Sequence, residues 1–224
     1  MTRQARAEIT REAIVAAAAK VFARMTFSQA TLGDVLREGG VTQGALYFHF
    51  DSKRSLALEI VRRQHEIFAK QAQVEQGLSS GGISGMIGLS ASLARLIASN
   101  DVVQAGLRLT TESAADLRSN DVDDALITSP YKDWVDFAEQ FVREARESGE
   151  LRTELSDPEV SRLIMSCFTG VQVVSRALTD WQDLLERLVD LWLVMTAALV
   201  IDQYRPSRQE ITLMLKERYQ VRAS

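Results

Sequence analysis

The sequence predicts an all-α protein in which a small domain of three short helices, residues 1–53, precedes a larger helical domain, residues 54–224. Two observations support this fold class. Apolar residues recur at the i, i+3, i+4 spacing of amphipathic helices, whereas the strict alternation typical of strands is rare. The chain also has only 3 Pro, so few positions would interrupt a helix.

The first helix is expected at about residues 7–24, because apolar residues there repeat at helical spacing. Its buried face would consist of Ile14, Ala17, Ala18, Val21 and Phe22.

A second, short helix should follow Thr31, a good N-cap, and end at Gly39 and Gly40, because glycine readily adopts the left-handed C-cap conformation. Val41 would then be buried, and Thr42 would cap a third helix, "QGALYF". Two short helices joined by a tight glycine turn form a helix-turn-helix unit, whose second helix can lie in the major groove of DNA.

The segment "VTQGALYFHFDSK", residues 41–53, has three aromatic residues, which is unusual for a solvated turn. We expect Phe48 and Phe50 to pack inward, and Tyr47 to face outward, where its hydroxyl can donate to a phosphate. The alternative interpretation places all three aromatic rings in the core, since aromatic residues at helical spacing are usually buried.

The larger domain is predicted to begin with a long helix after Asp51 and Ser52, with loops at residues 76–85 and 118–130. Further helices are expected at about 86–99, from Asn100 or Asp101, at 131–149, from an Asp157 cap to Leu178, at 181–203, and from Ser207.

Residues 181–203 are apolar on most of the helix circumference, so this helix must be buried. We expect part of that burial to come from a second subunit. Together with residues 158–178, the helix would form a four-helix interface in a homodimer, with Leu188 and Leu191 at the interface and not buried within one chain.

The net charge of −4 is unevenly distributed. Residues 1–63 contain ten Lys and Arg against six Asp and Glu, a balance of +4, which leaves −8 for the rest. A basic N-terminal segment is typical of an anion site, although ordinary charge scatter explains so small an excess equally well.

Composition argues against several other classes of protein. The apolar run at residues 191–201 is too short to span a bilayer, and the N-terminus lacks the apolar core of an export signal, so we expect no membrane association. One cysteine, Cys167, fits a cytoplasmic protein. With two His and no metal-ligand spacing, no cofactor, metal site or catalytic centre is predicted.

The segment "VTQGALYFHFDSK", preceded by "ATLGDVLREGG", resembles the DNA-binding segment of TetR-type bacterial repressors. In the larger domain, "AGLRLTTES", "YKDW", "ARESGEL", "FTGVQVVS" and "DWQDL" resemble the γ-butyrolactone autoregulator receptors of streptomycetes. The resemblance implies a homodimeric repressor. Its N-terminal domains would bind pseudopalindromic double-stranded operator DNA. Its larger domains would bind a signalling lactone, furan or butenolide that releases the DNA.

The resemblance also implies which residues contact DNA. Those matching the operator-contacting segment of the family are Thr42, Gly44, Tyr47, His49 and Lys53, to which we add Arg3, Arg6 and Thr31. Gln43 departs from the Lys of most relatives. Gln pairs well with adenine and Lys with guanine, so we expect an operator that prefers or tolerates A·T opposite Gln43.

For the ligand, Trp134 matches a pocket-lining Trp of the receptors, and Gln64 lies where relatives have a polar group that reaches the ligand. Cys167 stands where a Thr is common, and Leu107 and Val171 complete the expected apolar pocket. Without the resemblance, Trp134 would be interpreted as an ordinary core residue.

Two other functions remain open at this point. The chain could be a TetR-type repressor that responds to an unrelated drug or lipid. It could also be a small helical enzyme acting on a lactone, although "TTES", residues 110–113, has no His nearby in sequence.

Overall fold

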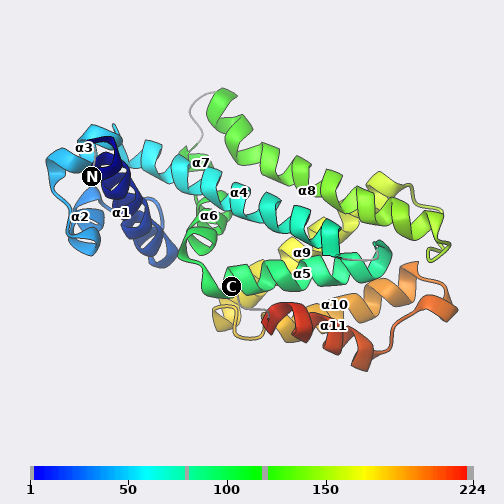
Figure 1. Ribbon diagram of the computed structural model, residues 1–224. Coiled ribbons are helices and arrows are strands. Elements are labelled where there is room, and N and C mark those ends of the chain that lie inside the picture. The colour runs from blue at the N-terminus through cyan, green and yellow to red at the C-terminus, as the bar shows by residue number, and fades with distance from the viewer. Residues whose placement is uncertain (1–2, 79–80, 118–120, 221–224) are drawn as a thin grey trace. The chain divides into compact units, whose positions relative to one another are not determined.

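The computed structural model describes residues 3–78, 81–117 and 121–220, and these ranges are almost entirely helical (Figure 1). Eleven α-helices and one 3-10 helix follow one another along this part of the chain. Besides the helices it contains one isolated antiparallel bridge, between Leu151 and Val200. The predicted all-α fold class is confirmed.

The helices form two compact units, each built from two stretches of chain. The first comprises Met1–Phe68 and Asn100–Pro130, and the second comprises Ala69–Ser99 and Tyr131–Ser224. Two long helices, α4 (Lys53–Leu78) and α8 (Asp121–Glu147), contribute residues to both units. The division at residue 53 expected from the sequence concerns function, and it stays a prediction.

In the first unit, α1 lies against α2, α3 and α6. The helices completed within this unit are α1 (Arg3–Arg24), α2 (Leu32–Gly39), α3 (Gln43–His49), α6 (Asp101–Glu112) and α7 (Ala114–Leu117). The predicted inner face of α1 is confirmed, because Ile14, Ala17, Ala18, Val21 and Phe22 are all buried. The helix begins at Arg3, four residues earlier than expected.

Local signals fix both ends of α2. The Thr31 hydroxyl accepts a hydrogen bond from the Asp34 amide at 3.2 Å, and the Asp34 carboxylate accepts one from the Thr31 amide at 3.0 Å. This reciprocal pair is a capping box. Gly40 ends the helix with φ at 58°, a conformation that glycine adopts without strain. Both predicted ends are confirmed.

Leu46 of α3 and Phe50, the C-cap residue that follows the helix, are buried, whereas Phe48 is 75% exposed. The expectation that Phe48 packs inward is therefore wrong. Residues four apart share a helix face, and a residue midway between them points the opposite way. Leu46 occupies the inner face of α3, so Phe48, two residues further on, must turn outward, and Phe50 reaches the core from the extended C-cap position. Val41 is only partly buried.

The second unit is built around α5, which packs against α10 and α11. The helices completed within it are α5 (Gly82–Ser99), α9 (Asp157–Thr179), α10 (Leu184–Leu199), the 3-10 helix η1 (Asp202–Tyr204) and α11 (Arg208–Gln220). By length and hydropathy α5 would also suit a membrane span. However, 72% of it is buried inside the protein, as is typical of a core helix.

Further helix boundaries differ from those expected. The predicted loop at residues 76–85 is shorter, because α4 continues to Leu78 and α5 begins at Gly82. The predicted loop at residues 118–130 is wrong from residue 121 onward, where α8 begins; residues 118–120 lie outside the described residues. Acidic residues favour the first turn of a helix because they complement its dipole, so this acidic run marks a helix start. Helix α9 is capped by Ser156 in a capping box with Glu159, not by Asp157, which is its first residue.

Helix α10 begins at Leu184 and ends at Leu199, shorter than the predicted 181–203. Asp180 and Trp181 have φ values of 50° and 64°, in the left-handed region, and so they break the helix before α10. Leu188 is buried within its own chain, so its expected place at a subunit interface is wrong, and Leu191 is half-buried. In an α-helix of 3.6 residues per turn, Leu188 shares the inner face with Leu184 and Trp192.

A buried carboxylate ties α4, α5 and α11 together within the second unit. Glu75 is 2% exposed, and its Oε1 accepts hydrogen bonds from the Ser92 hydroxyl at 2.6 Å and the Gln71 amide at 3.1 Å. Arg218 of α11 lies 3.4 Å from Oε2. Gly88 of α5 lies beside this pair, and a Cβ there would be 3.4 Å from the carboxylate, at ordinary van der Waals distance.

Candidate functional site

The outer face of α3 presents a compact set of exposed side chains. Gln43, Tyr47 and Phe48 are exposed, and a Cβ added at Gly44 would meet no atom within 4 Å. The buried Leu46 and Phe50 fix the inner face of the same helix. Helix α3 is therefore packed against the core on one side and exposes a face on the other, and at Gly44 a large partner can approach its backbone closely.

Both predicted threonines have structural roles. The Thr42 hydroxyl caps α3 by accepting a hydrogen bond from the Ala45 amide at 3.2 Å. The Thr31 hydroxyl is engaged in the α2 cap, where it also donates to Asp34 at 2.7 Å. Each hydroxyl can still accept a further hydrogen bond. Their roles in DNA binding stay predictions.

His49 and Lys53 follow the exposed face of α3. The His49 ring lies edge-on to Phe48, with ring centroids 4.9 Å apart. The Lys53 ammonium donates to the carbonyls of Phe27 and Ala30 at 2.7 and 2.9 Å, and it lies 4.3 Å from the Phe27 ring centre. Lys53 thus holds the segment before α2, and two of its three N–H groups serve that purpose.

Most of the N-terminal basic residues are paired inside the first unit. Those with a partner there are Arg11, Lys20, Arg24, Arg37, Lys53, Arg54, Arg62 and Arg63. Arg6 is exposed, and nothing is described for the side chain of Arg3. Most of these basic side chains are therefore occupied by partners within the unit, although pairing leaves the net charge of the segment unchanged.

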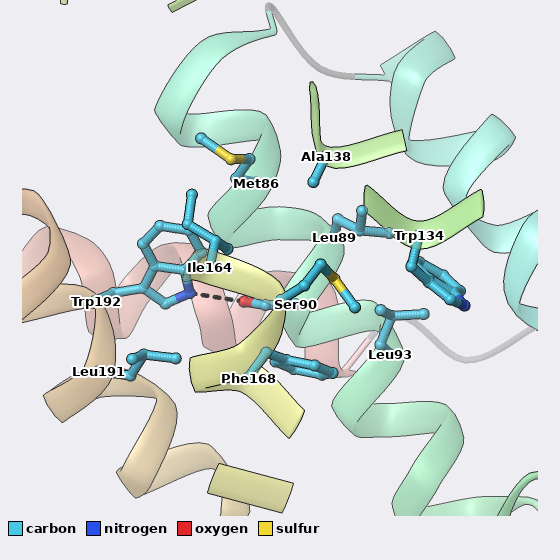
Figure 2. A pocket seen from close by; sticks show the side chains of 11 residues that line it. Met86, Leu89, Ser90, Leu93, Trp134, Ala138, Ile164, Phe168, Leu191 and Trp192 are labelled. Atoms are coloured by element: carbon cyan, nitrogen blue, oxygen red, sulfur yellow. Dashed lines mark hydrogen bonds between the residues drawn. The ribbon is translucent and has the colours of Figure 1, made fainter. Parts of the chain in front are cut away.

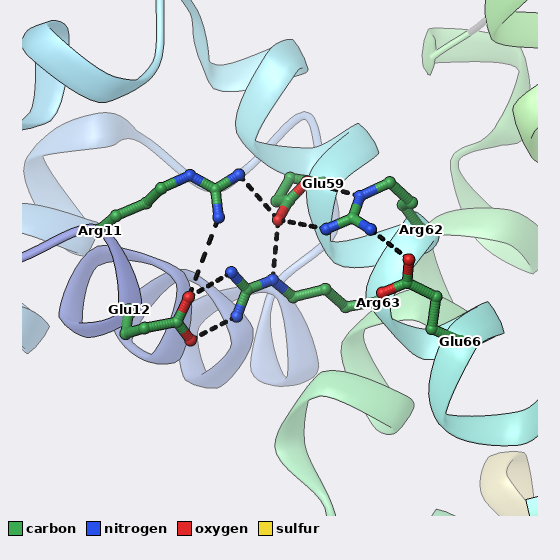
Figure 3. Close-up of polar contacts among 6 residues, drawn as sticks. All are labelled: Arg11, Glu12, Glu59, Arg62, Arg63 and Glu66. Carbon is green, nitrogen blue, oxygen red and sulfur yellow. Dashed lines mark hydrogen bonds and ion pairs between the residues drawn. The ribbon is translucent and has the colours of Figure 1, made fainter. Parts of the chain in front are cut away.

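Glu59 of α4 is the centre of the largest of these pairings (Figure 3). Its Oε1 forms ion pairs with Arg62 and Arg63 of the same helix, each with a nitrogen-to-oxygen distance of 2.8 Å, and with Arg11 of α1 at 2.9 Å. Arg63 also pairs with Glu12 of α1, with a nitrogen-to-oxygen distance of 2.6 Å. These ion pairs link α4 to α1, and α1 in turn packs against α3.

The charges in this network alter the acidity of its members. Burial alone would raise the pKa of Glu59, but hydrogen bonds from Arg62, Arg63 and Arg11 outweigh burial and lower the pKa to about 2. A hydrogen bond from Arg63 likewise lowers the pKa of Glu12. Both carboxylates therefore stay ionised at neutral pH, and the network persists.

The second unit contains an apolar cavity between α5, α8, α9 and α10 (Figure 2). The cavity, together with its opening to solvent, has a volume of about 420 Å³. Its walls are formed by Met86, Leu89, Ser90, Leu93, Trp134, Ala138, Ile164, Met165, Phe168, Leu191 and Trp192. No residue in this set carries a charge, so the cavity suits an uncharged, largely hydrocarbon molecule.

Of the five residues expected to bind a ligand, Trp134 lines this cavity. Cys167 and Val171 lie on α9 but are not among its lining residues. Gln64 and Leu107 belong to the first unit, where Gln64 is buried so close to α6 that a Cβ at Gly106 would lie 2.4 Å from it. The set of five stays a prediction.

Sequence reasoning missed most of the cavity. Ser90 and Trp192 are 102 residues apart in sequence, yet the Trp192 indole donates to the Ser90 hydroxyl at 2.8 Å. No local pattern connects such positions. The only available signal was Ser90 itself, a hydroxyl residue within the otherwise apolar segment "MIGLSASL".

Helices α9 and α10 also carry exposed apolar side chains. Leu178 and Val194 are each 68% exposed, and Leu163, Val173 and Val174 are exposed to a lesser degree. Exposed apolar residues grouped on adjacent helices are typical of protein interfaces. This surface, and not the one that contains Leu188, is the part of α9 and α10 available to a second subunit.

Two protein-family models match the chain. The model described as "Bacterial regulatory proteins, tetR family" matches residues 14–60, and the one described as "Tetracyclin repressor-like, C-terminal domain" matches residues 80–201. The first match contains α2 and α3, and the second contains every helix that lines the cavity.

Known proteins resemble the chain over most of its length. The A-factor receptor protein of Streptomyces griseus is 33% identical over 195 residues, which are 86% of this chain and 64% of that protein. The structure of CprB from Streptomyces coelicolor in complex with its operator matches with a TM-score of 0.79 and 27% identity, over 97% of this chain and 100% of CprB. A gamma-butyrolactone receptor, described as ArpA-like, matches with a TM-score of 0.77 and 26% identity, over 96% and 98%.

Proposed function

We propose, because this chain belongs to the TetR family of bacterial regulatory proteins, that it is a homodimeric repressor released from operator DNA by a small signalling molecule. The observation that carries this proposal is the presence of two separate sites. One is the exposed face of α3, and the other is an apolar cavity in a different unit. A repressor that responds to a ligand needs both. The protein acts in the cytoplasm, where its operator is.

The DNA-binding surface is the outer face of α3. Gln43 begins the helix and is exposed, so its amide can reach a base edge in the major groove. Tyr47, His49 and the third N–H of Lys53 contribute contacts to phosphate, which give affinity without sequence preference. Arg6, in the first helical turns of α1, extends this surface.

Operator preference at one base pair tests the role of Gln43. Wild-type protein should prefer or tolerate A·T there, and Gln43→Lys should shift the preference toward guanine by about 1–3 kcal/mol. Binding titrations on operator variants at fixed salt measure this shift, with Lys53→Ala as a control that should weaken binding to all sequences alike. An unchanged base preference in Gln43→Lys and Gln43→Ala would show that another residue reads this position.

The dimer forms through the exposed apolar faces of α9 and α10 described above. Its two pairs of helices would pack about a two-fold axis, which places a recognition helix on each side of the operator centre. Sedimentation at micromolar concentration should give a dimer. Val194→Asp should shift it toward monomer, because a charge would be buried at the interface.

The inducer is of the γ-butyrolactone, butenolide or furan type and binds in the cavity of the second unit. Similarity to the A-factor receptor protein over 86% of this chain supports this choice. Trp134→Ala should weaken the response to inducer and leave DNA binding intact. If the variant loses operator binding or unfolds, Trp134 is a purely structural core residue.

Two alternatives are tested in the same way. A repressor of the same family could respond to an unrelated drug or lipid, and mass spectrometry of ligand extracted from purified protein would identify such a molecule. An enzyme acting on a lactone is the alternative from another class, and a turnover assay would detect it. We propose a regulator, because the cavity walls carry no charged side chain that could act as an acid or base.

The central experiment has two steps. Selection from random DNA duplexes should yield a pseudopalindromic site that the purified protein binds at nanomolar to tens of nanomolar affinity. A panel of lactones, butenolides and furans should then contain a compound that releases the protein from that site. Failure of the first step contradicts operator binding, and failure of the second contradicts the proposed class of inducer.

A further inference from the structure

The most exposed large apolar side chain among the described residues lies on the face of α3 proposed to meet DNA. Phe48 is 75% exposed, whereas Leu46, two residues earlier, is 1% exposed and holds the opposite face in the core. The ring of His49 lies edge-on to the Phe48 ring, with ring centroids 4.9 Å apart. Because edge-to-face contacts between rings are favourable, this contact favours one orientation of the Phe48 ring.

Gly44 leaves the space beside the Phe48 ring open. The two residues are four positions apart in the same helix, so they share one face of α3. Gly44 has no side chain, and a Cβ added there would meet no atom within 4 Å. A partner that approaches the backbone of α3 at Gly44 therefore also reaches the Phe48 ring.

The chemistry of a phenyl ring limits what Phe48 can contact on DNA. Unlike the Tyr47 hydroxyl, the ring has no hydrogen-bonding group for phosphate oxygens or for the polar edges of bases. In the major groove, the apolar group that a base presents is the 5-methyl group of thymine. Other base edges would lose water against the ring without gaining a hydrogen bond, which is unfavourable.

We propose that Phe48 is a second base-reading residue of α3, which recognises the 5-methyl group of a thymine in each operator half-site. This inference rests on the proposed binding of operator DNA by α3. Gln43 reads one base pair through hydrogen bonds, and Phe48 reads another through apolar contact. Five residues of α-helix rise about 7.5 Å, and DNA rises about 3.4 Å per base pair. The thymine therefore lies about two base pairs from the pair that faces Gln43.

Replacement of thymine by uracil in the operator tests this proposal. Uracil lacks only the 5-methyl group, so each replacement removes one methyl from the major groove and keeps the base pair. The operator is the duplex that the full-length protein selects from random DNA, and each thymine is replaced in turn, in one half-site or in both. Binding titrations at fixed salt then give the affinity for every duplex.

We expect the wild type to be sensitive to one symmetric pair of thymines. Loss of a buried methyl should weaken binding about fourfold in one half-site and about fifteenfold in both. The sensitive thymine should lie about two base pairs from the position whose preference changes in Gln43→Lys.

Phe48→Ala and Tyr47→Phe form a matched pair of variants. Phe48→Ala removes the ring, so the ratio of thymine to uracil affinity at the sensitive position should fall to about one. Tyr47→Phe removes one hydroxyl from the same face and should weaken binding to both duplexes alike, which keeps the wild-type ratio. Phe48→Leu retains an apolar side chain and should keep part of the ratio. Using a ratio cancels any general loss of stability.

The outcomes separate this inference from the proposed function. Equal binding of thymine and uracil duplexes by the wild type overturns methyl recognition and leaves operator binding standing. A wild-type ratio that persists in Phe48→Ala assigns the methyl contact to another residue and also overturns the proposal. If the full-length protein selects no DNA site at all, both the inference and the proposed operator binding are wrong.

Discussion

The surroundings of α3 and of the cavity are held together by different physical means. Beside its apolar core, the first unit has a network of ion pairs in which Glu59 joins Arg11 of α1 to Arg62 and Arg63 of α4. The cavity of the second unit is enclosed by apolar and aromatic side chains. Ion pairs are directional and fix one geometry, whereas apolar contacts have no preferred direction and can rearrange. The first unit therefore contains a directional, salt-sensitive link beside its core, and the residues that line the cavity contain none.

The largest expected effect on stability comes from the apolar surroundings of the cavity. Trp192→Ala should lower the free energy of unfolding by about 3–5 kcal/mol, because it removes a large buried side chain and leaves a cavity. The loss should be the same in low and high salt. Urea denaturation at fixed protein concentration measures it, with the exposed Leu213→Ala as a control expected to change stability by less than about 0.5 kcal/mol. A strong salt dependence would contradict the distinction between the two regions.

Glu59→Gln tests the ion-pair network of the first unit. At pH 7 the substitution should lower the free energy of unfolding by about 2 kcal/mol, which lies between the values for exposed and fully buried ion pairs. The folded pKa of Glu59, about 2, lies below the ordinary value of 4.5. Its stabilisation is therefore fully present above about pH 4.5 and is lost as the pH falls toward 2. The difference in free energy of unfolding between wild type and variant should therefore become smaller as the pH falls over that interval.

Glu66→Gln is the control for this experiment. Among the described residues Glu66 pairs only with Arg62, and it is more exposed than Glu59. Its replacement should cost less than about 1 kcal/mol. Equal losses for the two variants would show that the network at Glu59 is no stronger than an ordinary surface pair.

Thr31→Ala tests the hydrogen-bonded cap of α2 in the first unit. Loss of the capping box of α2 should cost about 1 kcal/mol of stability. Thr10→Ala makes the same chemical change inside α1, where the hydroxyl only donates to the Arg6 carbonyl, and it should be nearly neutral. Thermal unfolding of the two variants should therefore differ, and identical melting temperatures would argue against a role for the cap.

Phe48→Ala should have the smallest effect on stability, within about 0.5 kcal/mol, because the ring is exposed. Operator affinity should nevertheless fall, since the ring lies on the face of α3 proposed to meet DNA. Phe50→Ala, two residues away and buried, should show the reverse ranking, with a large loss of stability. Operator titrations and denaturation curves on the same two proteins measure both quantities. Unchanged operator binding by Phe48→Ala would remove this residue from the interface.

The features that could be predicted from the sequence are those determined by residues close together along the chain. The inner face of α1, the cap at Thr31 and the left-handed Gly40 depend on helical periodicity and on the chemistry of single residues. The prediction for Phe48 was wrong because Leu46 of the same helix and Phe50, the residue that ends it, fill the space next to the core. Only the packed structure determines which of several aromatic rings is buried.

The cavity could not be predicted, because its wall comes from four helices that are distant in sequence. Trp134 was expected there only through the resemblance to receptors. Neither Ser90 nor Trp192 was expected there, since a serine in an apolar helix and a tryptophan in a buried one are both common. Their significance depends on a hydrogen bond across 102 residues.

The position of Arg218 matters for anyone who wishes to use this protein as a biosensor. Because its guanidinium neutralises the buried Glu75, the last helix is an integral part of the interior and not a trimmable tail. A chain truncated before Arg218 would retain a buried carboxylate that has lost its cation. Reporter fusions at the C-terminus should therefore keep the native chain through Arg218 and begin beyond it.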